Sequence, residues 1–131
     1  MKKVILISGL ALFSFFANAQ KVANVEGGGK LRVCDLDNNN NTRNCSTIES
    51  SGVSVGSIGT SKIAILYDNG KLRVCDIDNN NNTRNCSTIE SSGVSNVQLT
   101  GDRRVIITYD NGKKRACDID SNNNTRNCST L

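Results

Sequence analysis

The sequence predicts an all-β fold built from tandem four-stranded antiparallel repeats. Three observations lead to this prediction. The 131-residue chain contains three similar copies of one unit, its apolar residues alternate with the two-residue period of a strand, and no segment beyond the first nineteen residues shows a helical period. Copies this alike are typical of repeat proteins, in which each unit buries its apolar face against its neighbours.

The first nineteen residues have the pattern of a secretory signal peptide. A short basic start is followed by a mostly apolar run from Val4 to Phe16 and by the small-residue cleavage pattern Ala17-Asn18-Ala19. The apolar run is too short to cross a hydrocarbon core about 30 Å thick, so no membrane span is expected in the mature chain. We therefore predict a secreted or periplasmic protein whose signal peptide covers 1–19 and whose β domain covers 20–131.

The composition excludes several classes of function. The chain contains no His, so Ser–His and Cys–His catalytic pairs are impossible. Removal of Lys2 and Lys3 with the leader lowers the formal net charge from +4 to +2. A charge this small and this mixed argues against a nucleic-acid-binding surface. We expect a protein that is not an enzyme and does not bind nucleic acid.

The repeats have a clear period. The segment Lys30–Glu49 recurs as Lys71–Glu90 with one difference, Leu36 to Ile77, and a third version covers 113–131. We divide the mature chain into repeats at about 20–50, 51–92 and 93–131. The first repeat aligns with the second only from Lys21 onward, so it lacks the first of the four strands, and eleven strands are predicted in all.

Each element of one period has its own local signal. The predicted strands are Val94–Thr100, which alternates, Arg104–Tyr109, which is β-branched, and the segments matching Lys71–Asp78 and Thr83–Glu90. The turn Asp110-Asn111-Gly112 is a strong hairpin signal. In the last repeat Lys114 replaces the Leu72 of the middle repeat, which indicates a solvated outer edge.

Hairpin geometry predicts one disulfide in each repeat. A four-residue loop at 79–82 places Cys75 directly opposite Cys86, with Cα atoms about 4.5–5.5 Å apart, which a disulfide can bridge. The same register predicts the pairs Cys34–Cys45 and Cys117–Cys128, and it sets Lys30 opposite Glu49 and Lys71 opposite Glu90. Zinc binding is the alternative, although zinc ligands usually occur at two- to four-residue spacings that are not found here.

Acidic and amide side chains gather at the predicted hairpin tips. Each repeat carries an Asp-x-Asp pair before its Asn-rich loop: Asp35 and Asp37, Asp76 and Asp78, Asp118 and Asp120. Clustered oxygen atoms suit calcium, but the EF-hand pattern of ligands is incomplete. The other interpretation is that Asp and Asn form the turns themselves. No other cofactor is expected, and repetition of the acidic pair in every unit argues against a catalytic carboxylate dyad.

One segment of the repeat resembles a known family. Asp68-Asn-Gly-Lys-Leu-Arg-Val-Cys-Asp-Ile-Asp78 is similar to the turn and strand of a WD-repeat-type β-propeller blade, with Cys75 and Asp76 at the Trp and Asp positions. The resemblance covers 22–131 and implies propeller-like blades on a protein-binding scaffold. About two and three-quarter blades are fewer than the usual four to eight, so copies from several chains would complete a ring, unless the chain is a fragment. A β-trefoil is the alternative fold.

These observations predict a non-catalytic binding or scaffold module that self-associates through its open sheet edges. A protein partner or a second copy is therefore expected, and carbohydrate binding is the alternative. Three arginines near the hairpin tips are candidates for a partner surface: Arg43, Arg84 and Arg126.

Overall fold

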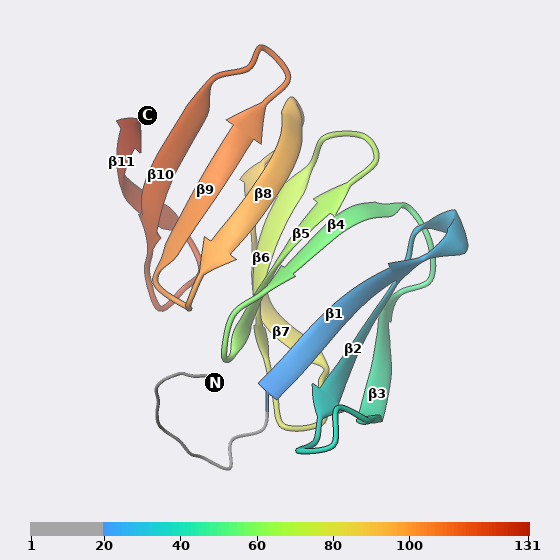
Figure 1. The fold of residues 1–131 in the computed structure, drawn as a ribbon. Helices are drawn as coiled ribbons and strands as arrows, with labels where there is room; N and C mark the ends of the chain where they lie inside the picture. Colours follow the sequence, from blue (N-terminus) through green and yellow to red (C-terminus); the bar gives the residue numbers. More distant parts are fainter. Residues whose placement is uncertain (1–19) are drawn as a thin grey trace, which may run out of the picture.

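A computed structural model describes residues 20–131, which form three separate antiparallel sheets (Figure 1). The predicted signal peptide falls on residues 1–19 and lies outside the described residues. No helix within 20–131 has the length and apolar character needed to cross a membrane. The all-β fold of tandem antiparallel repeats is confirmed.

Each sheet is a meander whose strands follow one another in sequence order. Sheet 1 contains β1 (Gln20–Glu26), β2 (Lys30–Leu36) and β3 (Thr42–Glu49), with the short turn η2 (Gly27–Gly29) between the first two. Sheet 2 contains β4 (Val53–Ile58), β5 (Lys62–Tyr67), β6 (Leu72–Ile77) and β7 (Thr83–Glu90). Sheet 3 contains β8 (Val94–Thr100), β9 (Arg104–Tyr109), β10 (Lys114–Ile119) and β11 (Thr125–Thr130).

The number and grouping of the strands confirm the repeat analysis. Residues 20–131 contain eleven strands, and the first sheet has three because its repeat lacks the first one. Every sheet contains strands of a single repeat, so the described residues form no closed barrel. The β-trefoil alternative is therefore wrong, because its repeats would share such a barrel.

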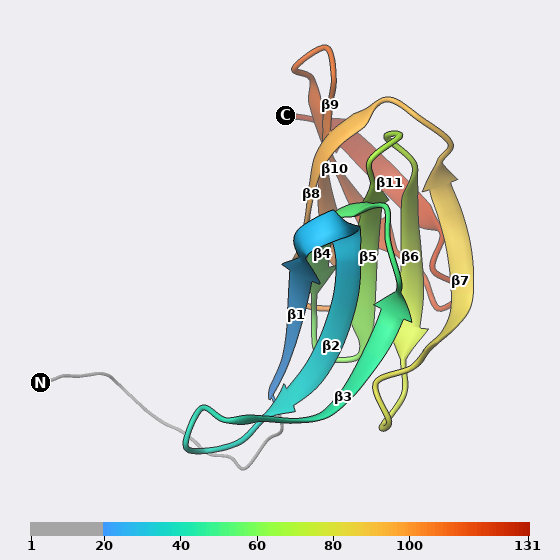
Figure 2. The same cartoon turned by 90° about the vertical axis from the view of Figure 1, so that its right-hand side faces the viewer.

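Sheet 2 lies between the other two sheets, which cover both of its faces (Figures 1 and 2). This position explains the continuous apolar run of β5, since a strand covered on both faces has no solvent side. Ile63 and Ile65 pack toward Leu31 and Val33 of sheet 1. Ala64 and the other alternate residues of β5 pack toward sheet 3. Full burial of each Ile or Leu contributes about 1.5–3 kcal/mol to folding.

The outer face of sheet 3 is more polar than the matching face of sheet 2. Lys114 is exposed at the position where the repeat has the fully buried Leu72, as the solvated-edge prediction requires. Ala116, at the position of Val74, is nevertheless 3 % exposed, so only part of this face is open to solvent.

The tip of each β-hairpin differs from the predicted four-residue loop. β6 ends at Ile77 and β7 begins at Thr83, so five residues form the loop, and Ile77 pairs with Thr83. The loop closes because the N–H of Asp78 donates to the carbonyl of Asn82 at 3.0 Å and the N–H of Asn81 donates back to Asp78. The predicted pairing of Asp78 with Thr83 is therefore wrong by one residue.

A β-bulge absorbs this one-residue offset. The ladder shifts between the Val74–Ser87 and Asp76–Arg84 pairs, which leaves Cys75 facing two residues of β7. Asn85 takes up the extra residue with a φ of 56°, in the left-handed region that Asn tolerates better than most residues. The same bulge with the same kind of Asn recurs in the other two repeats.

All three predicted disulfides are present despite the bulge. The pairs are Cys34–Cys45, Cys75–Cys86 and Cys117–Cys128, each with Cα atoms 4.1 Å apart. No described cysteine is free, so the zinc alternative is wrong. Three disulfides in so small a chain are typical of proteins that fold in an oxidising compartment outside the cytosol.

The predicted pairing of lysines with Glu49 and Glu90 is wrong, because a second register shift sets Leu31 opposite Glu49 and Leu72 opposite Glu90. Both glutamates instead reach the next sheet. The hydroxyl of Tyr67 donates to Glu49 at 2.5 Å, and the hydroxyl of Tyr109 donates to Glu90 at 2.7 Å. These contacts link neighbouring sheets at one end of the hairpins.

Candidate functional site

The second aspartate of each Asp-x-Asp pair shapes the turn that follows it. The carboxylate of Asp37 accepts hydrogen bonds from the N–H groups of Asn39 and Asn41, both at 2.9 Å. Asp78 and Asp120 accept the matching pairs of N–H groups in the other two repeats. The turn-forming interpretation of these three aspartates is confirmed.

The first aspartate of each pair lies across the sheet from a basic residue. Asp35 is the strand partner of Lys21, Asp76 of Lys62, and Asp118 of Arg104. The lysine Nζ atoms lie 2.9 Å from Asp35 and 2.8 Å from Asp76. The two aspartates of one pair therefore have different surroundings, although the sequence pattern makes them look alike.

A buried asparagine from the next sheet completes this ion pair. Asn81, which is 0 % exposed, extends from the β6–β7 loop of sheet 2 to sheet 1. Its side-chain amide donates to the carboxylate of Asp35 at 3.1 Å and to the carbonyl of Asn44 at 2.8 Å, and its carbonyl oxygen accepts from Lys21 at 2.6 Å. Every polar atom of the Asn81 side chain thus has a partner, which is what burial of an amide requires.

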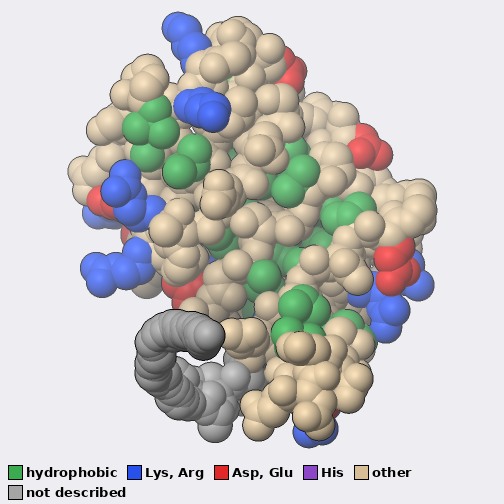
Figure 3. Space-filling model, viewed as in Figure 1, with side chains coloured by type: hydrophobic (Ala, Val, Ile, Leu, Met, Phe, Trp, Pro, Cys, Tyr) green, Lys and Arg blue, Asp and Glu red, His purple; other side chains and the backbone are tan. Residues whose placement is uncertain are grey.

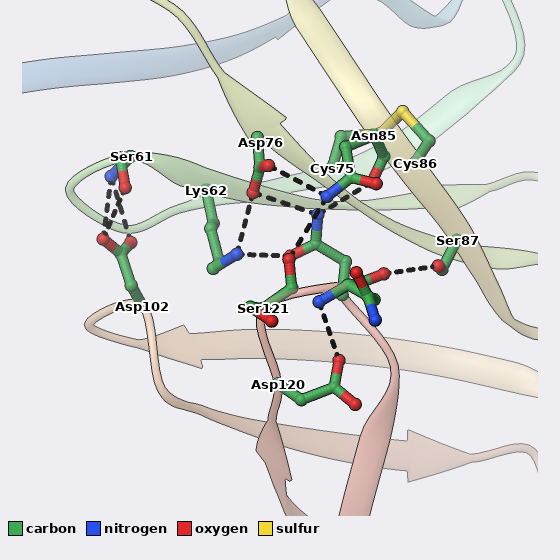
Figure 4. Close-up of polar contacts among 12 residues, drawn as sticks. Ser61, Lys62, Cys75, Asp76, Asn85, Cys86, Ser87, Asp102, Asp120 and Ser121 are labelled. Atoms are coloured by element: carbon green, nitrogen blue, oxygen red, sulfur yellow. Dashed lines mark hydrogen bonds and ion pairs between the residues drawn. A yellow bond between two sulfur atoms is a disulfide. The ribbon is translucent and has the colours of Figure 1, made fainter.

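The same contact recurs between sheets 2 and 3. Asn123, also 0 % exposed, donates to Asp76 at 3.0 Å and to the carbonyl of Asn85 at 2.8 Å, and it accepts from Lys62. Figure 4 shows Lys62 and Asp76 together at this contact. We call Asn40, Asn81 and Asn123 the loop asparagines. The basic residue, the aspartate and the bulge asparagine at matching positions of each sheet are called its asparagine-binding set. Lys21/Asp35/Asn44 surrounds Asn81, Lys62/Asp76/Asn85 surrounds Asn123, and Arg104/Asp118/Asn127 is the matching set of sheet 3.

Further hydrogen bonds surround each of the two internal contacts. The side-chain amide of Asn85 donates both to Asp76 at 3.1 Å and to the carbonyl of Ser121 at 3.2 Å, and Ser87 donates to the carbonyl of Asn122 at 2.8 Å. The residues Asn44 and Ser46 make the matching bonds between sheets 1 and 2. The bulge asparagine is thus part of the contact as well as of the backbone distortion.

A separate polar contact joins the β4–β5 and β8–β9 turns. The carboxylate of Asp102 accepts from the N–H of Thr60 at 2.8 Å. It also accepts from the N–H and hydroxyl of Ser61 at 3.0 and 2.8 Å (Figure 4). Sheets 2 and 3 are therefore joined by polar contacts at the β10–β11 loop and at the β4–β5 turn, with the apolar core between the sheets.

The electrostatics of the two filled binding sets favour ionised aspartates. Burial raises the pKa of Asp35, but hydrogen bonds from Lys21, Asn44 and Asn81, together with the lysine charge, outweigh it and hold the pKa below its usual value. Burial acts in the same way on Asp76, and the bonds from the matching side chains again lower its pKa. At neutral pH the binding set is an ion pair that presents one carboxylate oxygen and one ammonium group to the incoming amide.

The surroundings of Asp35 and Asp76 differ from those expected of a calcium site. The carboxylates of Asp35 and Asp76 each lie against a lysine nitrogen, which is the kind of group that a bound cation would have to displace. Within residues 20–131, no three acidic, Cys or His side chains gather closely enough to hold a metal ion. The hairpin tips within these residues carry no acidic cluster, so the structure adds no support to calcium binding.

The three candidate arginines lie on the last strand of each sheet, namely β3, β7 and β11, which we call the outer strands. Arg43, Arg84 and Arg126 are all exposed, each beside the disulfide-linked bulge. Arg126 also forms an ion pair with Asp120 at 3.2 Å. Each arginine is the strand partner of the first aspartate of its repeat, namely Asp35, Asp76 or Asp118.

Sequence reasoning missed the loop asparagines, because nothing within a run of four Asn residues distinguishes the third from the others. A usable signal was the basic residue at or next to the start of a strand, at Lys21, Lys62 and Arg104, in hairpin register with an aspartate. Where a neighbouring sheet covers such a charged pair, the pair needs polar partners.

Basic side chains gather over sheet 3, on the left of Figure 3. The exposed basic residues of the outer face and turns of that sheet include Arg103, Arg104, Lys113 and Lys114. A scan against protein-family models finds no match for this chain, and a search of curated proteins finds none either. The function therefore has to be inferred from the contacts themselves.

Proposed function

We propose that this protein is an exported, non-catalytic scaffold that associates through the two ends of its stack of sheets, with a second copy of the same chain as its partner. One observation carries the proposal: the polar groups that could have formed an active site are used to join one sheet to the next. The carboxylates of Asp35 and Asp76 are the clearest candidates for an active site, and each accepts hydrogen bonds from a lysine and from a loop asparagine.

Export is supported by the chemistry of the chain. All six cysteines form disulfides, which persist in oxidising compartments and are rare in the cytosol. The predicted signal peptide points in the same direction. The disulfides also supply stability that a stack of three small sheets lacks, since each closes a twelve-residue loop worth about 3 kcal/mol.

The number of sheets supports association. The resemblance to WD-repeat blades implies a ring of about four to eight units, and the described chain has three sheets packed face to face. Two copies would bring the total to six. The end sheets each have one face that contacts no other sheet within residues 20–131.

The test is the mass of the oxidised, exported protein in solution. Light scattering coupled to size-exclusion chromatography, over a hundredfold range of concentration, is expected to show a particle of two or more chains that dissociates on dilution. A monomer at every concentration would overturn the proposal. A glycan array run on the same sample would detect the carbohydrate alternative, and a saturable glycan signal from a monomer would favour it.

A further inference from the structure

We propose that the chains associate head to tail, with Asn40 of one copy seated in the Arg104/Asp118/Asn127 set of the next. This inference rests on the proposed self-association and specifies the contact that produces it. The two internal contacts show what the interface looks like, and each end of the molecule carries one half of it.

The first half is the loop that contains Asn40. Its backbone has the same conformation as the loops of Asn81 and Asn123, which contact a neighbouring sheet. Asn40, Asn81 and Asn123 have φ values of 64°, 64° and 65°. In each loop the N–H of this asparagine donates to the carbonyl of the preceding aspartate at 3.0 Å. Asn81 and Asn123 are completely buried against a neighbouring sheet, whereas Asn40 is exposed. Figure 2 shows the β2–β3 loop that carries it projecting from the body of sheet 1.

The second half is the binding set of sheet 3. Asn127 donates to the carboxylate of Asp118 at 3.2 Å, as the bulge asparagines do in the filled sets. Arg104 stands in place of the lysine, 4.0 Å from the same carboxylate. The side chains of Arg104 and Asp118 are 58 % and 49 % exposed, against 14 % and 33 % for the filled pair of Lys62 and Asp76.

A cavity of about 450 Å³ lies beside two of the three members of this open set, Arg104 and Asp118. Its lining consists of Thr100, Arg103, Arg104, Asp118 and Ile119. Arg104 and Asp118 are thus two of its walls, at the position where Lys62 and Asp76 enclose Asn123 in the preceding sheet. The cavity offers an amide both an acceptor, the carboxylate, and a cationic donor, the guanidinium.

The direction of the internal contacts makes the interface heterologous. A loop asparagine always inserts into the sheet that precedes its own, so sheet 3 can be filled only by a sheet that follows it. Within residues 20–131 no such sheet exists, and a second copy supplies one through its sheet 1. Such contacts join the tail of one chain to the head of the next and close into a ring or extend into a fibre, according to the rotation between copies.

The new interface is more polar than the internal ones. Lys114 stands at the position of Leu72, and Thr108 at that of Leu66, on the face of sheet 3 that would meet the next copy. Asn24 likewise stands at the position of Ile65 on sheet 1. We therefore expect reversible association that depends strongly on the Asn40 contact, because a smaller apolar surface is buried around it.

Two variants each remove one half of the contact. Asn40→Gly removes the amide and keeps a residue suited to the positive φ, and Asp118→Ala removes the acceptor at an exposed strand position. Each variant alone is expected to lose the oligomer, with association weakened tenfold or more, as for loss of hydrogen bonds to charged groups. Asn39→Ala is the matched control, since it alters the neighbouring side chain of the same exposed loop and should keep the wild-type mass.

A mixture of the two variants gives the decisive result. The Asn40→Gly chain keeps an intact binding set and the Asp118→Ala chain keeps an intact Asn40, so one junction remains possible and the mixture should form a dimer of one chain of each kind. A mixture that stays monomeric, or single variants that keep the wild-type mass, would overturn the head-to-tail contact while leaving self-association intact. A monomeric wild-type protein would overturn both.

Discussion

The side-chain amide of Asn123 in sheet 3 donates to the carboxylate of Asp76 in sheet 2 at 3.0 Å, and the asparagine is fully buried there. Two residues 47 positions apart in the chain thus form a polar contact between layers whose other contacts are mainly apolar.

Replacement of Asn123 by glycine is expected to lower the free energy of unfolding by about 1–3 kcal/mol, because Lys62 and Asp76 lose a hydrogen-bond partner. Asn40→Gly is the matched control. It has the same φ and the same change in the flexibility of the unfolded chain, but its side chain is exposed. Urea unfolding of both variants, at a concentration where the protein is monomeric, measures the difference. Equal losses would contradict a stabilising contact at Asn123.

The glycine of the Asp-Asn-Gly turn should be more sensitive to substitution where another segment of the chain covers it. Gly70 and Gly112 both have a φ near 85°, which costs alanine about 1–2 kcal/mol at either position. A Cβ at Gly70 would lie 2.7 Å from the backbone nitrogen of Gly93, whereas a Cβ at Gly112 would meet nothing within 4 Å. Gly70→Ala should therefore destabilise the protein by at least about 1 kcal/mol more than Gly112→Ala. Thermal or urea unfolding that ranks the two variants equally would contradict this reading of the contact.

Removal of one disulfide should cost about 3 kcal/mol, since each closes a loop of twelve residues in the unfolded chain. The double variant Cys75→Ala/Cys86→Ala tests the central sheet, and Cys117→Ala/Cys128→Ala tests the end sheet. Because the loops have equal length, the entropic part of the loss should be the same for both. The denaturation midpoint of each is compared with that of the wild type, and an unchanged midpoint would show that the disulfides do not stabilise the fold.

Acid should destabilise the protein. The pKa values of Asp35 and Asp76 are lowered in the folded state, as is that of Asp120, where the backbone N–H of Asn124 is the largest cause. An aspartate in an unfolded chain has a pKa of about 3.9. The stability these groups contribute is thus fully present above about pH 5 and is lost as the pH falls through 3.9 toward their folded pKa values.

Urea unfolding at a series of pH values between 7 and about 2.5 measures this loss. Asp76→Asn keeps the shape of the side chain but cannot be ionised, so it should be less stable than the wild type at pH 7 and lose less stability on acidification. A variant whose acid dependence matches that of the wild type would contradict the assignment of part of this loss to Asp76.

Calcium is expected to leave the thermal stability unchanged. A calcium ion at Asp35 or Asp76 would have to displace the ammonium group of Lys21 or Lys62, which already lies within 2.9 Å of the carboxylate. The melting temperature is measured in EDTA and again with millimolar calcium. A rise on adding calcium would show that the acidic pairs bind the ion after all.

Local patterns were enough to predict the strands and the disulfides, because a β-hairpin couples residue spacing directly to contact. The alternation in β8 and the spacing between Cys75 and Cys86 each have one simple geometric meaning. The five-residue loop was missed because it is only one residue longer than the predicted four-residue loop. The bulge at Asn85 compensates for that extra residue, so the cysteine spacing fits both loop lengths.

The inter-sheet contacts could not be derived in this way. Glu49 bonds to Tyr67, and Asn81 to Asp35, only because one sheet packs on the next at a particular rotation. That rotation results from the packing of all the apolar residues between sheets, and no segment of the sequence specifies it alone. Such contacts become predictable only once the sheets have been placed relative to one another.

The bulge at Asn44, Asn85 and Asn127 limits the direction in which the protein can grow. It distorts the outer strand of every sheet at the point where a cysteine and an exposed arginine also lie. A distorted, charged and cross-linked outer strand is a poor template for pairing with another strand, so lateral addition of chains along β3, β7 and β11 is disfavoured. With these three edges unsuited to strand pairing, growth along the stacking axis is favoured, and a polymer formed in that direction would lengthen without widening.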